Sequence, residues 1–268
     1  MNRTSGGVIS SFHNPRVQFV RSLIERRSPH AENGLFVAEG IRMGEEVLAA
    51  HLLPKSVYFS NPLSTRGQEL LARLEKLDTE LIELTPDVLS RLSATETSQG
   101  LLFVLPQQLL PQPTHADLVL IIDQLRDPGN LGTLLRTAAA VGVPLVFFTP
   151  GNVDPFMPKV VRAGMGAHFR LCLRQAQWTE IIEYCRVTQP APLKLLLASS
   201  AGGASLWQTD LTEPLALIVG GEAAGASPEA RQRADTLIHI PMPGNFESLN
   251  AGVAASIILY ELIRQRSL

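Results

Sequence analysis

Side chains suited to catalysis or ligand binding follow apolar runs at three places in the second half of the chain. The run Leu118–Asp123 leads into DQLRDPGN, which ends at Asn130, and then into a helical pattern that contains Arg136. Asn130 is a residue type that favours the N-cap of that helix. Arg136 lies off the apolar face, and three of its neighbours at spacings of three and four are very small: Gly132, Ala139 and Ala140. Such an arginine is accessible to an anionic partner such as a phosphate, and a structural ion pair is the alternative.

The second place is the end of the apolar run Leu215–Val219, which is followed by Gly220, Gly221 and Glu222. Glycines directly after a buried strand let backbone amides approach a ligand, and they put Glu222 at the strand end. A plain tight turn would explain the two glycines but not the glutamate. Ser199 lies in a similar, less specific loop after the run Leu193–Ala198.

The third place is the stretch Ile240–Leu262, in which a short turn around Met242 leads into a helix. The helix carries two apolar stripes, so we expect it to be buried on both sides. Its small residues, between Ala251 and Ser256, predict a close-packed neighbour. We expect the first helical turn to carry Glu247, Ser248 and Asn250, which either cap the helix or hold a ligand.

Composition limits the class of protein. The chain has 268 residues, of which 45% are hydrophobic and 18% charged, as expected for a globular protein with room for two domains. Cys172 and Cys185 provide no disulfide framework and no metal-ligand spacing, which favours a reducing cytoplasm and no metal site. We find neither a signal-peptide pattern in the first twenty residues nor an apolar run long enough to span a membrane.

Charge is unevenly distributed, although the net charge is only −2. The first thirty residues contain five arginines and one glutamate. Such a segment has the electrostatic character of a phosphate-binding patch, and a solvated helix face is the alternative.

Periodicity predicts two α/β domains. In residues 1–106, short strands near 35–37, 56–60, 81–84 and 101–105 alternate with helices near 15–24, 42–50 and 68–77. A proline-rich stretch without periodicity then predicts a linker at residues 107–116. In residues 117–268, six continuous apolar runs predict a doubly wound parallel sheet: Leu118–Asp123, Val143–Phe148, Phe169–Leu173, Leu193–Ala198, Leu215–Val219 and Thr236–Ile240.

In this order, NLGTLLRTAAAVG, LALIVGGEAAGAS and IPMPGNFESLNAGVAASIILYEL resemble the SpoU (TrmH-like) branch of the SPOUT RNA methyltransferases. Residues 11–16, 36–40 and 92–100 resemble, more loosely, the RNA substrate-binding domain that often precedes it. The resemblance implies S-adenosylmethionine-dependent 2′-O-methylation of a ribose, in ribosomal rather than transfer RNA. It also implies a homodimer, formed through a C-terminal domain with a trefoil knot.

Site residues are carried over by position from this resemblance. Those matching the catalytic motifs are Asn130, Arg136, Glu222, Ser248 and Asn250, and those matching the cofactor loops are Ser199, Gly220, Gly221, Ile240, Met242 and Leu249. In the first domain, the candidates for RNA binding are Asn14, Arg16, Arg21, Arg26, Arg27 and Arg42. Ala223 departs from the glycine that many members of this family have after the glutamate. Because an arginine side chain is a poor base under ordinary conditions, we expect Arg136 to stabilise charge rather than act as a base.

Two other classes make different predictions. A nucleotide-dependent oxidoreductase would carry G-x-G-x-x-G after the first strand of the second domain, where this chain has DQLRDPGN. A non-catalytic RNA-binding relative would have damaged motifs, whereas Arg136, Glu222 and Asn250 are all present.

Overall fold

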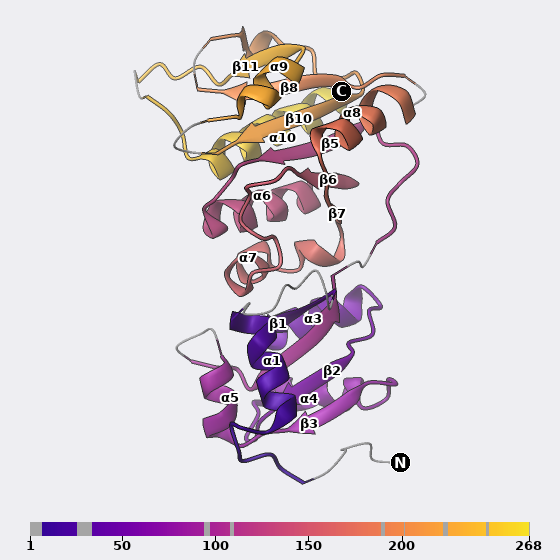
Figure 1. The fold of residues 1–268 in the computed structure, drawn as a ribbon, viewed down its shortest axis with the longest axis vertical. Helices are drawn as coiled ribbons and strands as arrows, with labels where there is room; N and C mark the ends of the chain where they lie inside the picture. Colours follow the sequence, from indigo (N-terminus) through magenta and orange to yellow (C-terminus); the bar gives the residue numbers. More distant parts are fainter. Residues whose placement is uncertain are drawn as a thin grey trace. The chain divides into compact units, whose positions relative to one another are not determined.

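The chain folds into two compact units in the computed structural model, which describes residues 7–25, 34–93, 97–107, 110–188, 191–200, 202–221, 225–244 and 247–267. The first unit comprises residues up to 109 together with Phe156–Phe169. The second comprises residues 110–155 and 170–268. Figure 1 shows the elements of each unit.

The first unit is built on a mixed four-stranded sheet in the order β1-β4-β2-β3. The strands are β1 (Leu35–Glu39), β2 (Ser56–Phe59), β3 (Glu80–Glu83) and β4 (Leu101–Pro106). The helices are α1 (Pro15–Glu25), α3 (Ile41–Ala49), α4 (Thr65–Leu74) and α5 (Pro86–Leu92). Successive strand residues point to opposite faces. Phe36 therefore joins the core under α3 and α4, whereas Val37 joins the core under α1 and α5.

A helical segment from the middle of the chain completes one of these cores. Helix α7 (Pro158–Gly164) and the 3₁₀ turn η1 (Ala167–Phe169) belong to the first unit, where Val161 and Phe169 pack in the same core as Phe36. The ring of Phe156 lies 5.1 Å from that of Phe36. The prediction that Phe169 begins a strand is wrong, because β7 starts only at Cys172.

The second unit contains a seven-stranded sheet in the order β7-β6-β5-β10-β8-β11-β9, and every pairing in it is parallel. The strands are β5 (Leu118–Asp123), β6 (Leu145–Phe148), β7 (Cys172–Gln175), β8 (Lys194–Ser199), β9 (Ala204–Ser205), β10 (Leu215–Gly220) and β11 (Thr236–His239). The predicted parallel sheet is confirmed. The two-residue strand β9 is too short to give a sequence signal.

Helices explain why the strands are apolar along their whole length. They are α6 (Pro128–Ala140), α8 (Trp178–Glu183), α9 (Pro228–Arg233) and α10 (Ala251–Arg266), with short turns η2 (Tyr184–Thr188) and η3 (Leu206–Gln208). Val119 and Ile218 share a core with Trp178 of α8 and Ala230 of α9. Helices α6 and α10 pack against each other, and α10 also contacts β10 (Figure 1).

Two predicted helix starts differ from the structure. Helix α6 begins at Pro128, and its N-cap is Asp127, whose carboxylate accepts a 2.7 Å hydrogen bond from the backbone N–H of Asn130. Asn130 is therefore not the N-cap. Helix α10 begins at Ala251 with Asn250 as N-cap, so Glu247 and Ser248 precede the helix rather than occupy its first turn.

Helix α10 is only partly buried. The predicted close neighbour is α6: a β-carbon at Gly252 would lie 3.1 Å from the carbonyl oxygen of Asn130. The prediction of burial on both sides is wrong, because Leu249 is 37% exposed, Val253 45% and Tyr260 57%. These three residues form what we call the exposed apolar stripe. No helix among the described residues has the length and apolar character needed to span a membrane.

Candidate active site

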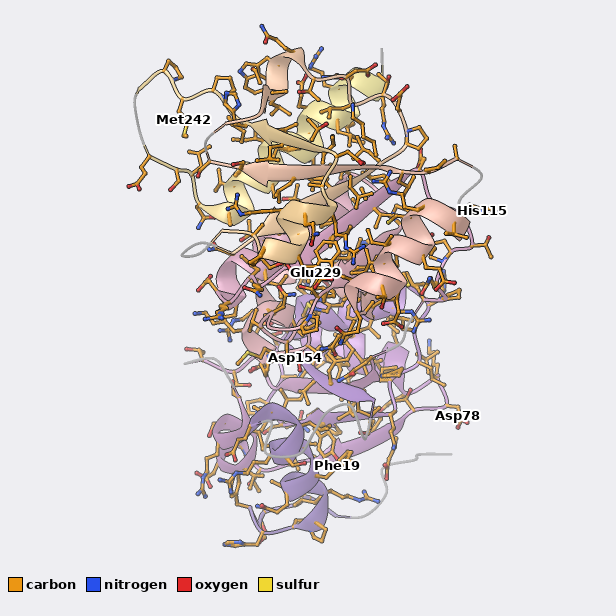
Figure 2. All side chains as sticks on the ribbon, turned by 45° about the horizontal axis from the view of Figure 1, so that its top comes forward. Phe19, Asp78, His115, Asp154, Glu229 and Met242 are labelled. Carbon is orange, nitrogen blue, oxygen red and sulfur yellow. The ribbon has the colours of Figure 1, made fainter. Side chains whose placement is uncertain are left out.

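A pocket of about 510 Å³ opens at the carboxyl ends of three neighbouring strands of the parallel sheet, β8, β10 and β11. Residues from the ends of these strands, from the loops that follow them and from the start of α10 form its wall: Ala198, Ser199, Ser200, Val219, Gly220, Gly221, Gly225, Ala226, Arg231, Ile240, Met242, Glu247, Ser248, Leu249, Asn250, Ala251, Ala254, Ala255 and Ile258. Figure 2 labels Met242 on the loop between β11 and α10, and Glu229 on α9. This is the edge at which ligands bind in open parallel sheets.

Close backbone contacts require the two glycines at the end of β10. A β-carbon at Gly220 would lie 2.4 Å from the backbone nitrogen of Ala226, and one at Gly221 would lie 2.3 Å from the carbonyl oxygen of Gln124. Both distances are shorter than any van der Waals contact. The glycines therefore let the strand end and its flanking loops come together and form the wall of the pocket.

Asp123 holds the loop between β10 and α9 in place by a hydrogen bond. Its side chain is buried at the end of β5, directly beside Gly220 in the sheet register. One carboxylate oxygen accepts a 2.8 Å hydrogen bond from the Thr149 hydroxyl, and the other accepts a 2.7 Å bond from the backbone N–H of Ser227. Ser227 in turn caps α9, because its hydroxyl accepts from the N–H of Ala230 at 3.1 Å. The loop at Gly225 and Ala226 is thereby anchored to the sheet.

Asn130 and Asn250 connect the starts of α6 and α10. The amide of Asn250 donates a 2.6 Å hydrogen bond to Oδ1 of Asn130, while its own Oδ1 accepts from the N–H of Val253 at 3.2 Å. Farther along the two helices, the hydroxyls of Thr137 and Ser256 lie 2.8 Å apart. These polar contacts hold α10 against α6.

Arg136 lies on the exposed side of α6 and does not line the pocket. Within the described ranges, no hydrogen bond or ion pair engages its guanidinium, so the structural ion pair considered above is not found there. Glu222 lies outside the described residues.

The structure brings most of the predicted second-domain residues together. All six predicted cofactor residues line the pocket: Ser199, Gly220, Gly221, Ile240, Met242 and Leu249. Of the predicted catalytic residues, Ser248 and Asn250 also line the pocket. Asn130 does not line it but accepts a hydrogen bond from Asn250.

The predicted RNA-binding residues lie in the first unit and are partly engaged with acidic neighbours. Arg16 pairs with Glu80 at 2.8 Å, and Arg21 pairs with Glu25 at 2.6 Å. Arg42 is exposed. The side chain of Asn14 accepts a 2.9 Å hydrogen bond from the backbone N–H of Arg16 at the start of α1. Arg26 and Arg27 lie outside the described residues.

Two residues of the site carried no recognised signal in the sequence. Asp123 reads as the last position of a buried strand, and Arg231 as one of several charges on a short polar helix. The buried carboxylate at a strand end was a possible clue, because a carboxylate is seldom buried without partners. Arg231 offered none, since its place in the pocket depends on how the loop before α9 folds.

The cysteines do not contribute a nucleophile. Cys172 and Cys185 are both buried, and burial raises the pKa of the Cys185 thiol to about 12. A thiol with so high a pKa is not ionised near neutral pH. In the part of the chain that the structure describes, no group of three potential ligands from histidine, cysteine, aspartate or glutamate is arranged to hold a metal ion.

Comparison with known proteins assigns the family. The family model described as the SpoU rRNA methylase family matches residues 117–260, and that of the MRM3-like substrate binding domain matches residues 14–102. The chain belongs to the SpoU rRNA methylase family. Its relatives include the 23S rRNA (guanosine(2553)-2′-O)-methyltransferase RlmP of Bacillus subtilis, with 30% identity over 95% of this chain and 98% of that protein. Human mitochondrial rRNA methyltransferase 3 is 31% identical, over 93% of this chain and 72% of that protein.

The fold of this SpoU methylase also resembles solved structures of rRNA methyltransferases. The AdoMet-bound rRNA methyltransferase from Sinorhizobium meliloti superimposes with a TM-score of 0.83 at 27% identity, covering 96% of this chain and 97% of that one. The predicted family, two-part α/β fold and enzyme class, an RNA ribose methyltransferase with S-adenosylmethionine as donor, are confirmed.

Proposed function

We propose that this protein transfers a methyl group to the 2′-hydroxyl of a ribose in ribosomal RNA, and that the pocket beside β10 binds the S-adenosylmethionine donor. The observation that carries the proposal is the convergence of six predicted cofactor residues on one pocket, in a chain similar over nearly its whole length to an AdoMet-bound rRNA methyltransferase. The relatives named above are ribosomal RNA methyltransferases, which favours ribosomal over transfer RNA.

The pocket suits a nucleoside with a charged tail. Its volume of about 510 Å³ is that of a small-molecule site. The side chains of Ile240, Met242 and Leu249 offer apolar contact for a purine ring, and the glycines at the end of β10 expose backbone groups for hydrogen bonding. When bound, the cofactor supplies an electrophilic methyl group on a sulfonium.

The surrounding side chains supply orientation and charge. Methyl transfer needs the ribose oxygen in line with the methyl carbon, and holding that geometry accounts for much of the acceleration. We assign this orienting role to Ser248 and Asn250, which line the pocket. Arg136 is assigned to stabilise the developing alkoxide and to grip the adjacent phosphate, and Glu222 to fix Arg136 or Asn250.

RNA binding is assigned mainly to the first unit, through Asn14, Arg16, Arg21, Arg26, Arg27 and Arg42. Support comes from the match to a substrate-binding domain over residues 14–102 and from the arginine excess near the start of the chain. Because the Bacillus relative acts on 23S rRNA, we also propose that the protein works in the cytoplasm.

We further propose a homodimer formed through the second unit. The exposed apolar stripe, which consists of Leu249 just before α10 and of Val253 and Tyr260 on it, supports the dimer, because large apolar side chains left exposed near one another in the chain often mark protein interfaces. The trefoil knot is likewise proposed from family membership.

The test is methyl transfer by the purified protein from labelled S-adenosylmethionine to unmodified ribosomal RNA. The label should be recovered on the ribose 2′-oxygen after digestion to nucleosides. Recovery on a base, or no incorporation into any ribosomal RNA while cofactor is bound, would contradict the proposal.

A further inference from the structure

Charged groups are rare in the wall of the pocket. Of the described residues that line it, only Arg231 and Glu247 carry a charge, and the rest are apolar, glycine or neutral polar. A pocket with one cationic and one anionic side chain matches a ligand that carries both a carboxylate and an ammonium group. The amino-acid end of S-adenosylmethionine carries these two groups on one carbon.

Arg231 is held where it can reach a ligand. It lies in the short helix α9, whose start is capped by Ser227 and anchored to the sheet by the buried Asp123. A β-carbon at Gly225 would lie 3.0 Å from Nη2 of Arg231, so the guanidinium rests against the backbone of this loop. Gly225 also has φ of +67°, a conformation that favours glycine. The backbone on one side of Arg231 is thus fixed before any ligand arrives.

The same helix provides a contrast that separates a ligand-binding role from a surface charge. Arg233, two residues farther on, pairs with Glu229 at 3.6 Å and does not line the pocket. Arg231 lines the pocket, and no carboxylate among the residues that the structure describes pairs with it. A guanidinium that lines a pocket and has no carboxylate partner among the described residues is suited to bind a ligand carboxylate through two parallel hydrogen bonds.

We infer that Arg231 binds the α-carboxylate of S-adenosylmethionine, so that the amino-acid end of the cofactor lies beside Gly225 and α9. Glu247 faces the same pocket from the segment before α10 and provides a negative charge for the α-ammonium group. The inference rests on the proposed function and adds to it the orientation of the cofactor. Arg231 is a specificity-determining residue in this account, because it distinguishes the cofactor from nucleosides that lack the amino-acid end.

Truncating the ligand tests this assignment directly. S-adenosylhomocysteine keeps the carboxylate and ammonium groups, whereas 5′-methylthioadenosine keeps the nucleoside and sulfur but lacks both. Binding of each to the intact chain would be measured by titration calorimetry for the wild type, Arg231→Ala, Arg231→Lys and the matched control Arg233→Ala. Arg231→Ala should weaken S-adenosylhomocysteine binding about tenfold while changing 5′-methylthioadenosine binding less than about twofold. Arg231→Lys should fall between, and Arg233→Ala should behave as the wild type.

The results separate this inference from the proposed function. Unchanged affinity of Arg231→Ala for S-adenosylhomocysteine would overturn the inference, and so would an equal loss for both ligands, which would mean that Arg231 only shapes the pocket. Retained binding of 5′-methylthioadenosine shows that the variant is folded. A wild-type protein that binds neither ligand would instead contradict the proposed cofactor, whatever the variants do.

Discussion

Asn250 donates a 2.6 Å hydrogen bond to Oδ1 of Asn130, which lies 120 residues earlier in the chain, and thereby joins the starts of α10 and α6. The same side chain caps α10 through the N–H of Val253. One residue therefore both starts the last helix and places that start beside α6, at the wall of the pocket. The two roles can be separated by substitution.

Asn250→Asp should keep the cap and lose the helix connection. A carboxylate still accepts from the N–H of Val253, but it cannot donate to Oδ1 of Asn130 and places two acceptors together. We expect thermal stability close to the wild type and a methyl transfer rate lower by about 100-fold. Asn250→Ala should show the same loss of rate and also lose about 1 kcal/mol of stability. Full activity of Asn250→Asp would mean that the Asn130 contact has no part in catalysis.

Arg136→Ala should abolish most of the activity without weakening the fold. The side chain is exposed, and no acidic partner holds it among the described residues, so little packing is lost. Loss of a cation at the developing alkoxide should lower the rate by at least about 100-fold. Arg136→Lys should recover little, because an ammonium lacks the planar fork. Cofactor affinity, measured by calorimetry, should be unchanged. A fully active Arg136→Ala protein would remove the catalytic assignment, and an unfolded one would point to a structural role.

Val253→Glu should convert the proposed dimer to a monomer. Val253 lies in the middle of the exposed apolar stripe, and an unpaired carboxylate there would be costly to bury in an interface. Light scattering on a sizing column should give twice the chain mass for the wild type and the single-chain mass for the variant. Arg264→Ala, which removes an exposed partner of Glu261 on the same helix, is the control and should remain dimeric. If the wild type and Val253→Glu have equal masses, the exposed apolar stripe is not the dimer interface.

Replacing Arg16, Arg21 and Arg42 together with glutamine should weaken RNA binding and reduce its dependence on salt. For every phosphate that the variant no longer neutralises, the slope of log affinity against log salt should fall by about one unit. The ion pairs of Arg16 and Arg21 are exposed enough for their removal to cost little stability. Arg73→Gln, an exposed arginine of the same unit outside the predicted patch, is the control. If the curves of RNA affinity against salt concentration superimpose for the triple variant and the wild type, these arginines do not contact RNA and only face solvent.

Sequence patterns predicted the parts of the fold that depend on local burial. Strands such as Leu118–Asp123 were recognised because a parallel sheet is covered on both faces, which makes the whole run apolar. The same signal could not assign Val161 and Phe169, because an apolar residue reveals that it is buried but not in which core. For the same reason, the stripe at Val253 and Tyr260 was predicted to be buried, although within one chain it is exposed.

Within the site, the order of motifs along the chain predicts which loops form the pocket better than it predicts which individual side chains line it. The need for glycine at Gly220 and Gly221 follows from their position at the end of a buried strand. In the structure, a β-carbon at either position would collide with a backbone atom of a neighbouring loop. The sequence offers two good N-cap residues for α6, Asp127 and Asn130, and Pro128, which favours the first helical position, is the signal that decides for Asp127. The position of Arg231 in the pocket depends on the path of the loop before α9, which no local sequence pattern predicts.

Ribose methylation of ribosomal RNA in cells lacking this protein tests the central claim most directly. All 2′-O-methylated positions would be mapped in ribosomal RNA from the wild type, the deletion strain, and the deletion strain carrying either the wild-type chain or Arg136→Ala. One ribose methylation should disappear on deletion, return with the wild-type chain and stay absent with Arg136→Ala. Methylation maps of ribosomal RNA that are identical in the wild type and the deletion strain would contradict the central claim.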